Sequence, residues 1–214
     1  MTLELGQFAR AWAGIGAGPG AAEAHAALLA AWSEPHRAYH TRDHLAACLA
    51  ALEGVTFADP DAVAIALWYH DAVYDTTRAD NEAASAALAR AHLSAAGAPE
   101  AAIARVEALI DATRHAAEPG DSDRDARLLV DIDLGVLGAG PERYARYEEE
   151  IRREYAWVPA AWFRARRAEL LRGFLARPRV YTTPEFAARE APARANLAWA
   201  IARLEAPDAG DGAV

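Results

Sequence analysis

Three histidines recur at intervals of four residues in the stretch HRAYHTRDHLAACL, namely His36, His40 and His44. Imidazole nitrogens bind divalent metals and exchange protons near neutral pH, so these residues are either candidate ligands or polar residues of an amphipathic helix. Thr41 is a good helix N-cap, which places His40 just outside the helix and His44 within its first turn. We therefore predict His44 as a metal ligand, His40 as an outer or second-metal residue, and His36 as solvent-exposed.

A second candidate is the adjacent pair His70 and Asp71 in ALWYHDAVYD. The residues three and four positions from His70 are apolar or aromatic, so a helix through this stretch would bury His70. Asp71 lies about 100° further around such a helix, where both side chains can reach one cation close to the helix. The alternative is a core histidine that is only hydrogen-bonded.

Asp133, in RLLVDIDLGVLG, has apolar residues at its neighbouring helical positions. An ionised carboxylate on an apolar face needs a cation, a metal or a proton. We predict a metal ligand here, the alternative being a buried ion pair with an arginine. Asp131 is expected to be less enclosed and to pair with Arg127 at the surface.

The elements that must position these residues are all expected to be helices. Alanine, leucine, glutamate and arginine dominate the chain, and it has no alternating β-branched run. Glycines and prolines separate ten predicted helices. These cover residues 3–15, 20–33, 41–53, 60–74, 80–96, 99–114, 123–137, 141–156, 159–176 and 184–204. The sequence predicts one all-α domain over residues 1–204 and a disordered tail over residues 205–214.

Composition narrows the function classes. The formal net charge of -9 argues against a nucleic-acid polymer as partner, whereas a small phosphate ester needs only a few local cations. All 22 basic residues are arginines, which suit phosphate contacts. The single cysteine, Cys48, excludes a disulfide framework and argues against a cysteine-based zinc site. The chain shows no membrane span and no signal peptide, so a cytoplasmic protein is expected.

Read in order, these residues form an H…HD…D arrangement, which resembles the HD-domain superfamily of metal-dependent phosphohydrolases. More narrowly, YHTRDHL, WYHDAVYD, DNEAASA, DIDLGVLG and RVYTTPEFAAREAPARANL resemble a bacterial family described as predicted HD-type metal-dependent phosphohydrolases, over residues 30 to 200. The resemblance implies that His44, His70, Asp71 and Asp133 hold a divalent cation. It implies hydrolysis of a small phosphate ester, such as a nucleotide, by a metal-activated water. Two imidazoles and two carboxylates favour Mn²⁺, Fe²⁺, Co²⁺ or Zn²⁺ over Mg²⁺.

The remaining site residues are predicted by type and place. Some HD nucleotidases carry a glutamate three residues after the HD pair, where this chain has Tyr74 followed by Asp75. The candidate acid–base groups are Asp71, Asp75, Glu82 and His115. The candidate phosphate contacts are Arg37, Arg42, Arg78 and Arg114. For Asp75 and Glu82 the alternative is a helix cap or a salt bridge, for His115 a cation favoured by the dipole at a helix C-terminus, and for each arginine a solvated surface position.

Two other function classes remain open at this point. Some HD-fold proteins bind two irons and oxidise their substrates with more histidines than four-ligand enzymes use, and His40 and His115 keep this alternative open. The third possibility is a non-catalytic metal-binding regulatory module. The complete set of four ligands counts against it, because a binding module has no need of an open metal site.

Overall fold

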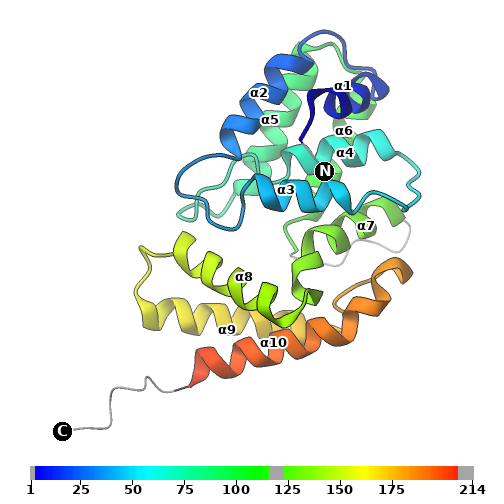
Figure 1. Cartoon of the computed structure of the whole chain (residues 1–214). Coiled ribbons are helices and arrows are strands. Elements are labelled where there is room, and N and C mark those ends of the chain that lie inside the picture. Colours follow the sequence, from blue (N-terminus) through cyan, green and yellow to red (C-terminus); the bar gives the residue numbers. More distant parts are fainter. Residues whose placement is uncertain (1–2, 116–122, 207–214) are drawn as a thin grey trace, which may run out of the picture. The chain divides into compact units, whose positions relative to one another are not determined.

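The computed structural model describes residues 3–115 and 123–206, and within these residues every regular element is a helix and none is a β-strand (Figure 1). The prediction of an all-α fold is confirmed. The helices form two compact units, one ending at Asp133 and the other beginning at Leu134. The single domain over residues 1–204 stays a prediction, and residues 207–214 of the predicted tail lie outside the described residues.

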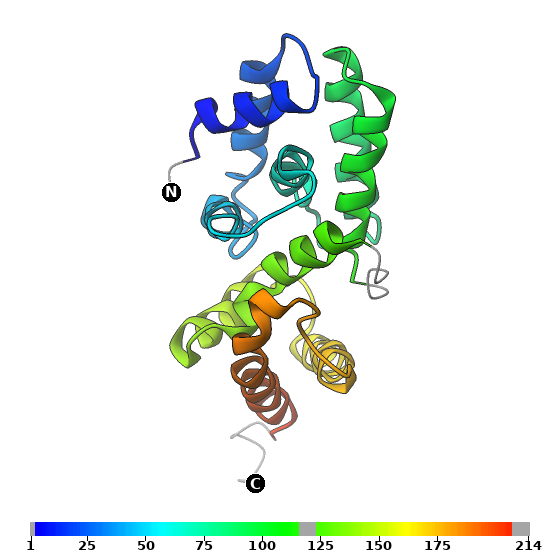
Figure 2. The same ribbon diagram turned by 90° about the vertical axis from the view of Figure 1, so that its right-hand side faces the viewer.

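The first unit is built around α4, Pro60–Tyr69, which Figure 2 views nearly end-on. Asp59 caps this helix by accepting a hydrogen bond from the Ala62 backbone N–H, and Pro60 occupies its first turn. Seven of the ten residues of α4 are buried, and the helix packs against α1, α3, α5, α6 and α7. The other helices of the unit are α1 Leu5–Gly14, α2 Ala21–Ala31, α3 Arg42–Ala50, α5 Asn81–Ala95, α6 Glu100–Ala112 and α7 Arg124–Asp133.

The second unit contains three long helices and two short 3₁₀ helices. These are η1 Leu134–Gly138, α8 Pro141–Glu154, α9 Ala160–Ala176, η2 Pro184–Arg189 and α10 Glu190–Glu205. Helix α10 packs along α9 and against η1. The Asn196 side chain fixes the end of η1 by donating hydrogen bonds to the carbonyls of Leu137 and Ala139.

Three predicted helices differ from those observed. The helix predicted over 60–74 ends at Tyr69, so His70 is its C-cap and Asp71 follows in a turn. The helices predicted over 123–137 and 184–204 each contain a 3₁₀ segment, η1 and η2. In η1 two glycines weaken the α-helical preference, and in η2 a proline begins the segment. None of the described helices is both long and apolar enough to cross a membrane.

Candidate metal centre

The first two histidines of the centre come from α3 and from the end of α4. The Thr41 hydroxyl accepts a hydrogen bond from the Asp43 backbone N–H, as predicted for an N-cap, and His44 is buried in the first turn that follows. His70 is 1% exposed, and its Nδ1 lies 2.8 Å from the Leu67 carbonyl oxygen. A ring that donates from Nδ1 to a carbonyl presents its Nε2 lone pair on the other side, which is the arrangement of a metal-ligating histidine.

Three donor atoms from α3, α4 and α7 converge. His44 Nε2 lies 3.2 Å from His70 Nε2, and Asp133 Oδ1 lies 3.2 Å from His44 Nε2 and 3.4 Å from His70 Nε2. Ligands that share a tetrahedral metal at about 2.1 Å are about 3.4 Å apart. The spacing therefore fits a cation held between them, and the donors suit a borderline transition metal.

Two further donors border this trio. Asp71 Oδ2 lies 3.2 Å from His70 Nε2 and 3.9 Å from His44 Nε2. Cys48, one turn after His44, is buried with its Sγ 3.7 Å from both ring nitrogens of His44. Donor atoms of His44, Cys48, His70 and Asp133 all lie within 4.8 Å of one another, so this group could hold a metal ion.

Cys48 was missed by the sequence reasoning, which treated the single cysteine as an argument against a thiol ligand. Its four-residue spacing from His44 on the apolar side of α3 was the available indication, because residues four apart share a helix face. The thiol is a candidate ligand on position alone. Burial, together with the charges of Asp133 and Asp71, raises its pKa well above the usual range.

Burial and close contact between histidines and carboxylates shift the pKa values of the groups at the centre. Burial lowers the pKa of His44, although Asp133 opposes the shift. Burial would also lower the pKa of His70, but the Asp71 charge and hydrogen bonds to Asp133 and Asp71 raise it well above its usual value. For Asp133, burial is outweighed by hydrogen bonds from His115, His44 and His70, which hold its pKa well below the usual range. The two carboxylates therefore favour a positive charge at this place, either on His70 or on a metal ion.

Two more histidines flank the carboxylates. His115 Nε2 lies 3.0 Å from Asp133 Oδ2. The residue follows the end of α6 with a φ of 53°, a left-handed conformation that non-glycine residues seldom adopt. His40 Nε2 lies 4.0 Å from Asp71 Oδ2, and its ring stacks on Tyr74 with centroids 4.1 Å apart. The structure therefore brings both histidines to the centre, one beside each carboxylate.

Arg37, predicted as a phosphate contact, is instead fully engaged inside the protein. Its guanidinium has five N–H donors. Nε and Nη2 donate to Glu34, Nη1 donates to the carbonyls of His40 and Asp71, and Nη2 also donates to the carbonyl of Ala72. With every donor used, Arg37 has none left for a phosphate.

Two aromatic rings hold the same guanidinium in place. Its central carbon lies 5.4 Å from the ring centroids of both Trp32 and Tyr74. Trp32 is completely buried and donates its indole N–H to the Trp68 carbonyl, and its ring also lies beside that of His70, with centroids 5.4 Å apart. Arg37 is thus a positioning residue that joins the loop carrying His40 to the turn carrying Asp71.

The other predicted arginines lie at the surface. Arg78 pairs with Asp80 and Arg114 with Asp111, while Arg42 is exposed at the start of α3. Within residues 3–115 and 123–206, no hydrogen bond or ion pair joins these arginines to the centre. Their assignment as phosphate contacts stays a prediction.

The predicted acid–base residues outside the centre have other surroundings. Asp75 is exposed and shapes a turn, since its Oδ1 accepts hydrogen bonds from the backbone N–H and the hydroxyl of Thr77. Hydrogen bonding to Thr77 lowers its pKa. Glu82 is half-buried in the first turn of α5. Among the described residues neither side chain forms a hydrogen bond to the centre, so His115 and His40 are better placed for proton transfer.

The expected difference in burial between Asp131 and Asp133 is wrong. Asp131 is 0% exposed, whereas the Asp133 side chain is 12% exposed. Residues two apart on a helix lie about 200° apart around its axis, so the two carboxylates face different surroundings. The apolar neighbours of Asp133 within α7 do not reveal what other helices place around each carboxylate. Of the two aspartates, the more exposed one, Asp133, lies at the centre.

No protein-family model, curated protein or solved structure matches this chain.

Proposed function

We propose that the centre binds a divalent transition metal and hydrolyses a small phosphate ester. The convergence of His44, His70 and Asp133 donors at separations of 3.2–3.4 Å carries this proposal. The ordered H…HD…D arrangement and its resemblance to HD-type phosphohydrolases supply the reaction class. A small substrate also suits a chain whose net charge is -9, because polyanions would be repelled.

We assign Asp71 as the fourth ligand and Cys48 as a thiol that lines the site. The Asp71 carboxylate is next to His70 Nε2, on the side where that ring presents its lone pair. Cys48 Sγ, in contrast, is equally far from both nitrogens of His44, so the sulfur lies beside the ring rather than ahead of Nε2. A Co²⁺ complex without a thiolate-to-metal absorption band would agree with this assignment.

The chain's own side chains then divide the work. When bound, the metal would supply positive charge and lower the pKa of a water. Asp133 is kept in orientation by His115, and His70 by the Leu67 carbonyl. His40, beside Asp71 and with its side chain 19% exposed, is placed to donate a proton to a leaving alcohol oxygen.

The test combines metal analysis with a panel of phosphate esters. Purified protein would be loaded with Mn²⁺, Co²⁺, Zn²⁺ or Mg²⁺ and assayed with p-nitrophenyl phosphate, bis-p-nitrophenyl phosphate and nucleoside monophosphates. In His70→Ala and Asp133→Asn, metal affinity and activity should each fall by more than roughly 100-fold. Mutating a residue that only orients a ligand typically costs up to about 100-fold, and loss of the ligand itself should cost more. Asp111→Asn, which removes an exposed carboxylate, is the matched control.

Two results would overturn the proposal. Full metal content in both ligand variants would show that these residues do not hold the metal. A metal-loaded protein that turns over no ester in the panel would leave a binding module as the better account. Circular dichroism of each variant separates loss of ligand from loss of fold.

A di-iron oxygenase is the second candidate, favoured by one observation. His40 lies beside Asp71 and His115 beside Asp133, so each carboxylate has a histidine beyond the four-ligand set. Iron-loaded protein would then show a mixed-valence electron paramagnetic resonance signal in air. A phosphohydrolase with one metal gives no such signal.

A further inference from the structure

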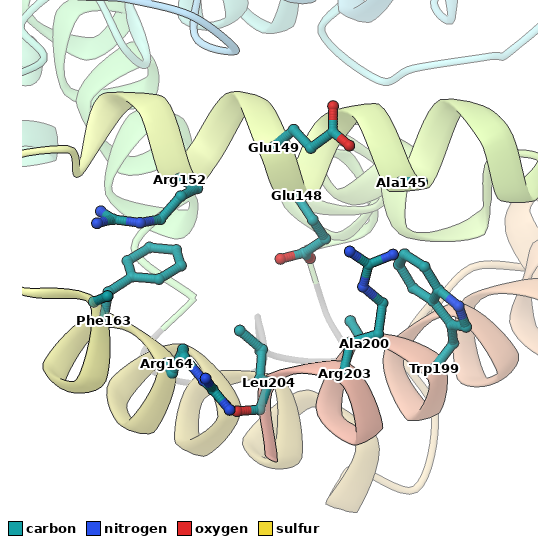
Figure 3. A pocket seen from close by; sticks show the side chains of 11 residues that line it. Ala145, Glu148, Glu149, Arg152, Phe163, Arg164, Trp199, Ala200, Arg203 and Leu204 are labelled. Atoms are coloured by element: carbon teal, nitrogen blue, oxygen red, sulfur yellow. The ribbon is translucent and has the colours of Figure 1, made fainter. Parts of the chain in front are cut away.

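A separate cavity of about 310 Å³ lies within the second unit (Figure 3). Helix α8 forms one wall, and α9 and α10 form the other. Its volume is at the lower end of the range typical for small-molecule sites. The cavity shares no residue with the metal centre, so a ligand bound there would be independent of the proposed function.

The cavity is cationic in a chain that is acidic overall. From residue 134 onward the sequence has 13 arginines against 11 acidic residues, whereas residues 1–133 have 9 against 20. Three arginines, one from each long helix, line the cavity, namely Arg152, Arg164 and Arg203. The positive charge of the chain is thus concentrated in its second part, where the cavity lies.

The acidic residues at the cavity do not cancel this charge. Glu148 points inward but is held by Arg167, whose Nε and Nη2 lie 3.0 and 2.9 Å from its carboxylate oxygens. The Glu149 carboxylate points away from the cavity (Figure 3). The one carboxylate that faces the cavity, that of Glu148, is therefore already paired with a cation, and Arg152, Arg164 and Arg203 leave the lining with an excess of positive charge.

Arg203 is the arginine with donors to offer. Arg152 donates to the carbonyls of Tyr155 and Val158, and Arg164 to that of Leu204. Within the described part of the chain, Arg203 makes no hydrogen bond or ion pair, and its guanidinium stacks on the Trp199 ring at 4.9 Å. The stack orients a planar fork of the kind that binds phosphate with two parallel hydrogen bonds.

We propose that this cavity binds a small organic phosphate with a flat ring, of the size of a nucleoside monophosphate. The phosphate would pair with Arg203, and the ring would pack among the aromatic and apolar side chains, chiefly Phe163, Trp199 and Leu204. Aromatic walls supply stacking for a ring, and the neighbouring cations supply charge for its phosphate. Inorganic phosphate lacks the first of these interactions and adenosine lacks the second.

The test is calorimetric titration of the full chain with adenosine monophosphate in the presence of EDTA, which keeps the metal centre out of the measurement. We expect binding that weakens roughly tenfold or more in Arg203→Gln, because a charge-assisted bidentate contact is lost. Arg166→Gln is the matched control, since it removes the same charge from an α9 side chain that is 76% exposed. Adenosine and inorganic phosphate should each bind more weakly than the nucleotide.

A second measurement locates the ligand. Protein labelled with 6-fluorotryptophan gives one ¹⁹F resonance per indole, and Trp199→Phe assigns the relevant one. Adenosine monophosphate should shift that resonance more than any other. The proposal fails if no binding occurs at about 5 mM, a concentration that would detect even millimolar affinity. It also fails if Arg203→Gln and Arg166→Gln behave alike, or if inorganic phosphate binds as tightly as the nucleotide.

Discussion

At the scale of single residues, the guanidinium of Arg37 forms five hydrogen bonds beside the metal centre. It binds backbone carbonyls of the loop that carries His40 and of the turn that carries Asp71. Backbone carbonyls at these places would otherwise be buried without partners, which is costly. The position of Asp71 relative to His70 therefore depends on a side chain more than thirty residues away in the sequence.

Replacing Arg37 tests this dependence. Arg37→Lys keeps the charge but has three donors in place of five, so we expect weaker Co²⁺ binding by about tenfold and a loss of about 2 kcal/mol of unfolding free energy. Arg42→Lys, at an exposed position, should change neither quantity. Titration of the Co²⁺ absorption spectrum and urea unfolding measure the two effects. An unchanged spectrum and affinity in Arg37→Lys would remove its positioning role.

His70 gives the centre a pH dependence. Asp71 and Asp133 raise the pKa of His70 well above its usual value despite burial, so in the metal-free protein they favour the protonated ring. A metal must displace that proton, so Zn²⁺ affinity should rise with pH, by about tenfold per unit until the His70 pKa is passed. Calorimetry in buffers of different ionisation enthalpy should count about one proton released. An affinity independent of pH from 6 to 8 would contradict the expectation.

The same raised pKa of His70 makes the stability of the metal-free protein fall as pH rises, whereas metal affinity rises. A group whose folded pKa is raised stabilises the fold fully below its unfolded pKa, about 6.5 for histidine, and this contribution is lost as pH rises through the folded pKa. The pKa of Asp133 is lowered by folding, so this group stabilises the fold above its unfolded pKa of about 3.9. That contribution to the free energy of unfolding is lost as the pH falls from there through the folded pKa.

At the scale of elements, α4 and α7 are joined at their starting ends. The carboxylate of Asp125, in the first turn of α7, is 2% exposed and accepts hydrogen bonds from the backbone N–H groups of Ala58 and Asp59 just before α4. Arg105 lies 3.6 Å from the same carboxylate. Helix α4 ends just before His70 and α7 ends at Asp133, so this junction helps to set the register of these two side chains.

Asp125→Ala should therefore destabilise the protein by about 3 kcal/mol, because two enclosed N–H groups lose their acceptor. Asp111→Ala removes an exposed partner of Arg114 and should cost at most about 1 kcal/mol. Urea unfolding of both variants beside the wild type measures the difference. Equal losses of unfolding free energy in the two variants would contradict a stabilising role for the hydrogen bonds that Asp125 accepts.

Sequence reasoning located the elements because glycine and proline mark their ends and Thr41 caps α3. It placed His70 and Asp71 inside a helix because apolar residues continue to Tyr74. The helix instead ends at Tyr69, and Arg37 takes up the carbonyls of Asp71 and Ala72 beyond it. A contact between residues this far apart leaves no pattern in the local sequence. Without it, the sequence presents Arg37 only as an arginine near the candidate ligands, and therefore as a phosphate contact.

At the scale of the whole molecule, metal binding and folding are linked. An ion that binds only the folded centre at 100 times its dissociation constant stabilises that state by about 2.7 kcal/mol. For a chain of this length we expect the midpoint of thermal unfolding to rise by about 5–10 °C. Calorimetry with Zn²⁺ and then with EDTA measures the shift, which should vanish in Asp133→Asn.

The same calorimetry tests the prediction of one domain over residues 1–204. One cooperative transition that moves with metal agrees with it. Two transitions, of which only one moves, would show that the units ending at Asp133 and beginning at Leu134 unfold separately. Adenosine monophosphate would then be expected to raise the temperature of the other transition, because its proposed cavity lies in the second unit.

The placement of Trp32 has an optical consequence. Its fixed indole lies 5.4 Å from the ring of His70 and 6.1 Å from that of His44, centroid to centroid. Ions with unpaired d electrons, such as Co²⁺ and Cu²⁺, quench indole emission at close range, whereas Zn²⁺ does not. The ultraviolet fluorescence of the unlabelled protein should therefore distinguish which kind of ion occupies the centre and follow its exchange in real time.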